Sequence, residues 1–204
     1  MPLIFQCFRP DAGLGAQWRK TAGFLPEHKL VVSVGRLTAM KDHLMLIRAA
    51  VHVLAVEPGA RFAIAGEGSG PIRGDLEAAI QRTGLERVVS LLGRRSDIPA
   101  ILNAASVVVS SSRYGEGVQN SLAEAMACGR PLVATNVGDA SRYFSDDDIV
   151  VSPEDAEAMA QAILLQFSRQ YADKSTLRIA HAKSCFSPDR MFEKLERCLL
   201  AVAH

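Results

Sequence analysis

Six short runs of apolar and β-branched residues alternate along the chain with longer stretches of helical periodicity. The runs occupy residues 30–34, 61–65, 88–92, 106–110, 132–135 and 149–151. Short buried strands separated by helices form βαβ units, in which helices cover both faces of a parallel sheet. The sequence therefore predicts an α/β fold, a Rossmann-like doubly wound parallel sheet of about six strands.

Glycines follow most of these runs and indicate which edge of the sheet carries the function. The five are Gly35, Gly66, Gly93, Gly115 and Gly138. Right-handed crossovers place the loops after parallel strands along one edge, where open sheets bind their ligands. We therefore expect the functional residues in the loops that contain these glycines.

The charge balance and the cysteines argue against several kinds of site. Lys plus Arg number 23 against 22 Asp plus Glu, so no net field favours nucleic acid as a partner. The four cysteines form no C-x-x-C pair and no histidine stands at a metal-ligand spacing, which predicts no metal site and a reducing compartment. No apolar stretch approaches the ~18 residues of a membrane span. We expect a soluble, cytoplasmic domain, and association with the inner face of a membrane stays open.

The 204 residues suit one main domain. We divide the chain into a linker segment (residues 1–29), the domain itself (residues 30–186) and a C-terminal helix (residues 187–204). Within the linker segment, residues 5–10 are predicted to be an extended strand and residues 16–23 a short helix.

The helix predicted over residues 42–56 carries apolar residues at spacings of three and four, which predict its core-facing side. They are Leu44, Ile47, Val51 and Leu54. His43, on the first turn of this helix, is interpreted as a surface residue.

Two glutamates, Glu116 and Glu124, flank seven residues that end one loop and open the next helix. The helix is predicted to begin at Asn120 or Ser121. Free backbone N–H groups at a helix start attract anions, and the two carboxylates can accept hydrogen bonds from hydroxyls on either side of that anion. This arrangement predicts a nucleotide-sugar site. Alternatively, Ser121 and Glu124 form a capping box, in which the glutamate serves only the helix.

The segment EGVQNSLAEAMACGRPLVAT, residues 116–135, resembles the donor-binding half of family 4 glycosyltransferases of the GT-B fold. The resemblance runs from about Phe8 to the C-terminus. It implies a nucleotide-diphospho-sugar donor, a carbohydrate or lipid-linked acceptor, retention of anomeric configuration, and no obligatory metal or cofactor.

Family 4 enzymes have two such domains with the reaction between them, and this chain has room for a single GT-B half. The resemblance therefore implies an N-terminal, acceptor-side domain, supplied in cis or in trans.

Arg36 and Lys41 lie in the loop after the first predicted strand. Two cations there can stabilise the negative charge that grows on a departing diphosphate, although loop cations are more often only solvated. The resemblance assigns both residues to the donor diphosphate. It assigns Glu116 to hydroxyls of the donor sugar near the reacting carbon, and Glu124 to the ribose hydroxyls.

The resemblance also implies that backbone groups bind the donor. The residues concerned are Gly35, Gly66, Gly68, Gly117, Val118, Gln119, Asn120 and Ser121. The side chains of the last five are expected to vary freely, since their N–H groups do the binding. Gly66 and Gly68 form either a close approach to the nucleotide or an ordinary turn, and they lack the G-x-G-x-x-G spacing of dinucleotide sites. Arg94 either stacks on the base or is a surface arginine.

The prediction is the donor-binding domain of a retaining glycosyltransferase. One alternative is a non-catalytic nucleotide-sugar-binding module. Another is a GT-B sugar-nucleotide epimerase, which would release free nucleotide without any acceptor.

Overall fold

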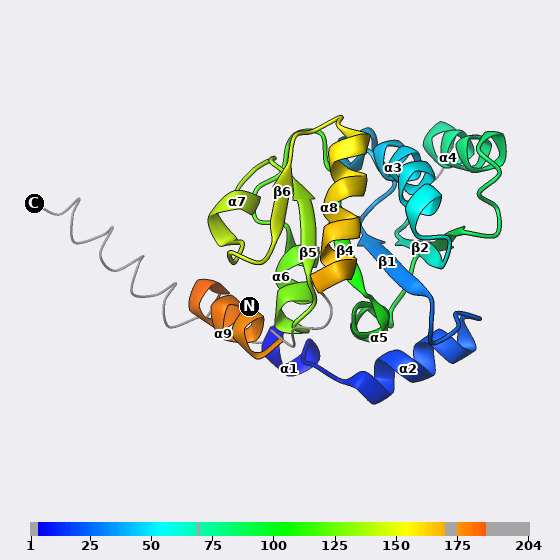
Figure 1. Ribbon diagram of the computed structural model, residues 1–204. Helices are drawn as coiled ribbons and strands as arrows, with labels where there is room; N and C mark the ends of the chain where they lie inside the picture. The colour runs from blue at the N-terminus through cyan, green and yellow to red at the C-terminus, as the bar shows by residue number, and fades with distance from the viewer. Residues whose placement is uncertain (1–3, 69, 170–174, 187–204) are drawn as a thin grey trace, which may run out of the picture.

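A computed structural model describes residues 4–68, 70–169 and 175–186 of the chain. Its centre is a six-stranded sheet in the order β3-β2-β1-β4-β5-β6, with every neighbouring pair parallel (Figure 1). The strands are β1 (Lys29–Val34), β2 (Ala60–Ala65), β3 (Val89–Gly93), β4 (Val107–Ser110), β5 (Leu132–Thr135) and β6 (Ile149–Val151). The predicted fold class and all six predicted strands are confirmed.

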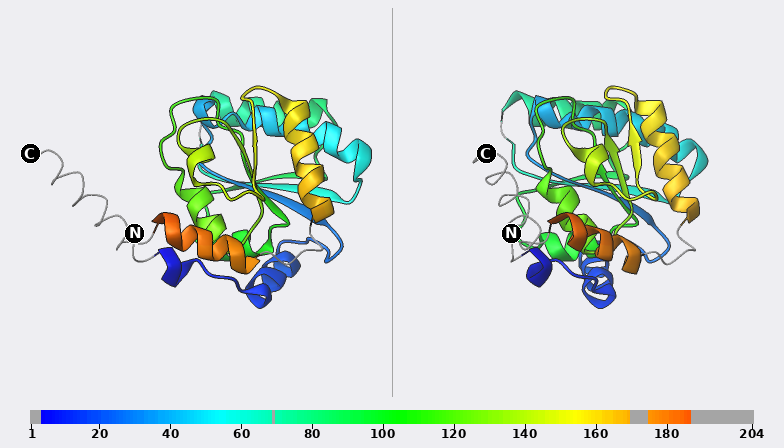
Figure 2. Two further views of the ribbon diagram at one scale, coloured as in Figure 1. Left: turned by 60° about the vertical axis from the view of Figure 1, so that its left-hand side comes forward. Right: turned by 90° about the vertical axis from the view of Figure 1, so that its left-hand side faces the viewer.

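Helices cover both faces of the sheet, giving three layers that are visible edge-on in Figure 2. One face carries α3 (His43–Val56), α4 (Pro71–Arg82) and α8 (Ala156–Ser168). The other carries α2 (Ala12–Thr21), α5 (Ile98–Ala104), α6 (Asn120–Ala127) and α9 (Ser175–Phe186). Three short elements are α1 (Ile4–Cys7), the 3-10 turn η1 (Ala39–Lys41) and α7 (Ala140–Tyr143).

Strand β1 shows how the pleat divides the core between the two faces. Val31 packs toward α3 and α8, whereas Leu30 and Val32 pack toward α5 and α6, because successive side chains point to opposite faces. All three side chains are fully buried. This two-sided burial explains why the strands read as continuous apolar runs rather than alternating ones.

Two local predictions were wrong. Residues 5–10 were expected to be extended, but α1 forms a helical turn in which Phe8 N–H donates to Ile4 C=O at 2.7 Å. The turn places Ile4, Phe5 and Phe8 against the core on the α6 side of the sheet.

In α3, Val51 was expected to face the core but is 43% exposed. The buried residues of α3 are His43, Met45, Leu46, Ile47, Ala49, Ala50 and Val53. Because α3 packs against α4 and α8 as well as the sheet, its buried face is wider than the predicted stripe and includes Met45, Leu46, Ala49 and Ala50.

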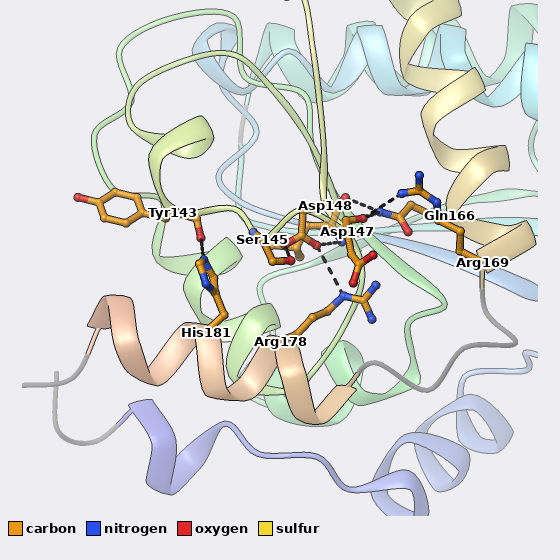
Figure 3. A network of polar contacts seen from close by, with 9 residues as sticks. Tyr143, Ser145, Asp147, Asp148, Gln166, Arg169, Arg178 and His181 are labelled. Atoms are coloured by element: carbon orange, nitrogen blue, oxygen red, sulfur yellow. Dashed lines mark hydrogen bonds and ion pairs between the residues drawn. The ribbon is translucent and has the colours of Figure 1, made fainter.

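Helix α9 is fastened to the loop between α7 and β6 by a polar network (Figure 3). The Asp148 carboxylate is fully buried and accepts from Leu132 N–H at 3.1 Å and from both the N–H and the hydroxyl of Ser145. Arg178 Nε, from α9, lies 3.7 Å from Asp148 Oδ1. His181 Nε2 lies 2.9 Å from the carbonyl oxygen of Tyr143 and adds a second attachment.

The C-terminal helix predicted for residues 187–204 lies outside the described residues. In the described part of the chain, every helix is too short or too polar to cross a bilayer.

Candidate functional site

The strand order creates a switch point between β1 and β4. From β1 the chain winds outward through β2 and β3, and from β4 it winds the other way through β5 and β6. The connections therefore diverge at the carboxyl ends of these two strands and leave the crevice in which doubly wound sheets bind ligands.

Two loops meet at this crevice: residues 35–42 follow β1 and residues 111–119 follow β4. Arg113 N–H donates to Met40 C=O at 2.7 Å, and Ser111 Oγ donates to Lys41 C=O at 2.9 Å. These bonds fix the spacing of the two loops, so residues far apart in the sequence share one site.

Lys41 and Glu116 meet directly across the switch point. Lys41 Nζ lies 2.6 Å from Glu116 Oε1, and the side chains are only 15% and 9% exposed. The sequence predicted both residues at the site, but not their pairing with each other.

Glu116 is held from two further sides. Its Oε1 accepts from Ser112 Oγ at 2.6 Å. Its carbonyl oxygen lies against Gly138, where an added Cβ would approach within 2.4 Å. Gly138 also has a φ of +66°, in the left-handed region. The turn after β5 thus supports the loop after β4.

Arg36 has an exposed side chain at the start of the loop after β1. Its carbonyl oxygen lies 3.3 Å from Nε2 of His43. The prediction that His43 is a surface residue was wrong, because its side chain is only 3% exposed. Burial lowers the pKa of His43 to about 4, so the imidazole is neutral and supports the backbone that carries Arg36.

Gly66 and Gly68 let two loops of the same edge touch. A Cβ on Gly66 would lie 1.8 Å from the carbonyl oxygen of Gly35, and one on Gly68 would lie 2.3 Å from Leu37 Cβ. These glycines are therefore required by contact between the loops after β1 and β2.

Helix α6 begins at Asn120, as predicted, and points its first turn into the same loop region. The residue before it, Gln119, places no side-chain hydrogen bond on the first turn, and no acidic residue lies there. The first N–H groups of α6 therefore keep their capacity for an anion. Just before them, the Val118 side chain is exposed and Gly117 has open space around it.

The Gln119 side chain has a structural role in addition to the role predicted for its N–H group. It is 6% exposed, and its Oε1 accepts from Ser110 Oγ at 2.5 Å. Its buried Nε2 has no hydrogen-bond partner among the described residues. Gln119 is therefore part of the support beneath the loop as well as of its backbone.

The N-cap of α6 is Gln119 and Ser121 lies inside the first turn, so Ser121 and Glu124 form no capping box, and Glu124 lies on the second turn. That alternative was wrong. Desolvation raises the pKa of the half-buried carboxyl to about 7, and no hydrogen bond or ion pair to it occurs among the described residues. Burying a carboxylate without a hydrogen-bond partner costs free energy, so Glu124 is suited to binding a ligand.

Two other residues contribute less. The side chain of Arg94 is 84% exposed and lies 3.8 Å from Glu67 Oε2, a distance typical of a weak surface pair. Asp139, next to Gly138, is paired with Arg142 at 3.1 Å. The structure does not bring Arg94 together with Lys41 and Glu116.

Three serines were not predicted as part of the site: Ser110 is the last residue of β4, and Ser111 and Ser112 follow it. All three are at most 7% exposed. A run of hydroxyl residues directly after an apolar strand, at the ligand edge, was the signal that could have indicated them.

A separate cavity of about 810 Å³ lies at the opposite edge of the sheet, beside α2. Arg19 lines it, but this guanidinium donates to the carbonyl oxygens of Leu25, Pro26, His28 and Ala104 and to Ser106 Oγ. The arginine thus holds the loop between α2 and β1, and its donors are used within the fold.

The sequence model of the family described as glycosyl transferases group 1 matches residues 28–168. The chain belongs to this family. The match spans β1 to α8 and so contains both loops of the switch point. The predicted resemblance to glycosyltransferases is confirmed.

Individual relatives agree with this assignment. The α-D-kanosaminyltransferase of Streptomyces kanamyceticus is 35% identical over 72% of this chain and 38% of its own length. The lipopolysaccharide core biosynthesis mannosyltransferase LpsB of Rhizobium meliloti is 27% identical over 71% of this chain and 43% of its own. The chain therefore spans about two fifths of these group 1 relatives.

The crystal structure of Anabaena HepE in complex with UDP and glucose superposes with a TM-score of 0.84 at 23% identity. The match covers 96% of this chain and 54% of HepE. It confirms the fold of the group 1 domain.

Proposed function

We propose that this chain is the donor-binding domain of a glycosyltransferase that takes its sugar from a nucleoside-diphosphate sugar. The observation that carries the proposal is the Lys41–Glu116 pair, which joins a cation and a carboxylate across the switch point beside the start of α6. HepE, which has the same fold, was solved with UDP and glucose.

The diphosphate would lie between the loop after β1 and the start of α6. As the bond from the anomeric carbon to the phosphate oxygen breaks, the bonding electrons stay on the diphosphate, which gains negative charge. Arg36, Lys41 and the first N–H groups of α6 would stabilise that charge as it forms. The two cations supply what a metal ion would otherwise supply, so the proposal includes no metal and no cofactor.

The two glutamates would orient the rest of the donor. Glu116 would accept hydrogen bonds from hydroxyls of the sugar near the reacting carbon, and Glu124 would accept them from the ribose hydroxyls. The unpartnered state of Glu124 supports this role, because bound hydroxyls would return the hydrogen bonds that burial removed.

Transfer would take place against an N-terminal GT-B domain, present in cis or in trans, that holds the acceptor. We propose retention of anomeric configuration and a carbohydrate or lipid-linked acceptor, as LpsB is named for lipopolysaccharide core biosynthesis. The reaction would then take place in the cytoplasm, at the inner face of a membrane where the acceptor is lipid-linked.

Calorimetric titration of the 204-residue chain with UDP, GDP and ADP and with their hexose conjugates tests donor binding. One base should bind, and Arg36→Ala and Lys41→Ala should each weaken that binding. Arg48→Ala, an exposed arginine on α3, is the matched control. Failure of all three diphosphates to bind, or equal binding by the site variants and the control, would refute the proposal.

A transfer assay separates the enzyme from the alternatives. Addition of an N-terminal domain from a group 1 relative, with its acceptor, should produce transferred sugar. Donor binding without transfer would favour a non-catalytic module, and release of free nucleotide without acceptor would favour an epimerase.

A further inference from the structure

Ser112 occupies an unusual position between the core and the site. Its side chain is fully buried in the loop directly after β4, and its Oγ donates to Glu116 Oε1 at 2.6 Å. Lys41 Nζ reaches the same oxygen at 2.6 Å. Among the described residues, no hydrogen bond reaches the other oxygen, Oε2.

The direction of the serine hydroxyl follows from its neighbours. Ser110 Oγ lies 3.2 Å from Ser112 Oγ and competes with Glu116 as acceptor. A carboxylate paired with a lysine is ionised and can only accept, and a bond to a charged acceptor is shorter and stronger than one between neutral hydroxyls. Ser110 in turn donates to Gln119 Oε1. The Ser112 hydroxyl therefore donates its hydrogen bond to Glu116.

The backbone around Ser112 is also fixed. Thr135 Oγ1, at the end of β5, donates to the Ser112 carbonyl oxygen at 2.5 Å. A serine has one rotatable bond before its hydroxyl, so a fixed backbone gives a fixed donor position. Ser112 can thus hold Glu116 at one oxygen with little freedom.

We propose that Ser112 is a positioning residue for Glu116. With Lys41 it occupies Oε1, so that the carboxylate presents Oε2 to a hydroxyl of the donor sugar. The inference rests on the proposed function, because only a sugar-bearing donor gives Oε2 a partner.

The test compares a nucleoside diphosphate with its sugar conjugate, using UDP with UDP-glucose or, for a guanine site, GDP with GDP-mannose. The contribution of the sugar is the dissociation constant of the diphosphate divided by that of its sugar conjugate, and it is compared between variant and wild type. Ser112→Ala should reduce the contribution of the sugar about tenfold, the scale of one hydrogen bond to a charged group, while binding of the diphosphate changes less than twofold.

Ser106→Ala is the matched control. Ser106 is also buried and hydrogen-bonded, to Leu30 N–H and Arg19, but it lies at the opposite edge of the sheet, before β4. It should leave both dissociation constants unchanged. A merely structural role for Ser112 would weaken diphosphate and conjugate together, and that result would overturn the proposal.

Thermal unfolding gives a readout without ligand. If the hydroxyl acts through Glu116, Ser112→Ala should lower Tm less in a Glu116→Ala background, which has no acceptor, than in wild type, and strictly additive losses would overturn the contact. Wild-type protein that binds no diphosphate would overturn the proposed function and this inference with it. Diphosphate binding with an unchanged sugar contribution in Ser112→Ala would overturn this inference alone.

Discussion

Nζ of Lys41 and Oε1 of Glu116 lie 2.6 Å apart, although the two residues belong to loops that follow β1 and β4. The pair is mostly shielded from water, so each charge depends on the other. A ligand diphosphate would therefore meet a lysine whose position is already set by Glu116, which is a form of preorganisation.

Lys41→Ala should lower the free energy of unfolding by about 3 kcal/mol, because it leaves the Glu116 carboxylate buried without its counter-charge. Adding Glu116→Gln should restore part of this loss, since a neutral amide needs no cation. Arg36→Ala is the comparison, because its side chain is exposed and its removal should cost under about 0.5 kcal/mol. Urea unfolding measures all three, and equal losses for Lys41→Ala and Arg36→Ala would show that the pair is not structural.

The same two cations should behave alike in catalysis. Arg36→Ala and Lys41→Ala should each remove about 2 to 4 kcal/mol of stabilisation from the departing diphosphate, the scale of one preorganised donor. The measurement is kcat/KM for transfer with the companion domain present. Unchanged kcat/KM in both variants would exclude the assigned role.

Glu124→Gln should stabilise the domain while it weakens donor binding. The folded pKa, about 7, is raised by desolvation above the ordinary 4.5, so the unfolded chain releases the proton first. The wild type thus loses stability as pH rises from 4.5 to 7, and the difference from the variant is constant above 7. At pH 8 the variant should be more stable by roughly 1 to 3 kcal/mol.

Denaturant unfolding at pH 5 and pH 8, with nucleotide titration at pH 8, checks the Glu124 prediction. Glu86→Gln, in the exposed loop between α4 and β3, is the control and should change neither quantity. A variant less stable than wild type at pH 8 would mean that the carboxylate has a structural partner.

The six strands were predictable because burial on both faces of a parallel sheet leaves continuous apolar runs. The helix after the loop was predicted to begin at Asn120 or Ser121, and α6 begins at Asn120. These are local signals, and they survive in the sequence.

The contacts that complete the site are not local. Lys41 meets Glu116, and Ser112 directs its hydroxyl to the same oxygen, only because β1 and β4 are neighbours. The burial of His43 and Glu124 likewise depends on tertiary packing, which a periodicity within one helix does not contain.

Gly138→Ala should disturb the site by displacing the loop that carries Glu116. Its φ of +66° costs an L-residue about 1 kcal/mol, and the new Cβ would lie 2.4 Å from the carbonyl oxygen of Glu116. The loop must move, so donor affinity should fall together with Tm. Gly74→Ala, with open space around it inside α4, should instead raise stability by about 0.5 to 1 kcal/mol.

Arg178→Met should loosen α9 at neutral pH by leaving Asp148 buried with no counter-charge. Burial raises the pKa of Asp148, and hydrogen bonds from Ser145 and the charge of Arg178 oppose that rise, so losing the arginine raises the pKa further. We expect a loss of about 3 kcal/mol at pH 7 that shrinks as the pH falls, because a protonated Asp148 needs no cation. Arg178→Met with Asp148→Asn should recover part of the stability, since the neutral amide needs no cation, although its single oxygen can accept from only one of Leu132 and Ser145, which donate to different oxygens of Asp148. Because the loop that Asp148 anchors follows α7 and Gly138, hydrogen exchange in residues 138–148 should rise in the single variant and return toward wild type in the double variant.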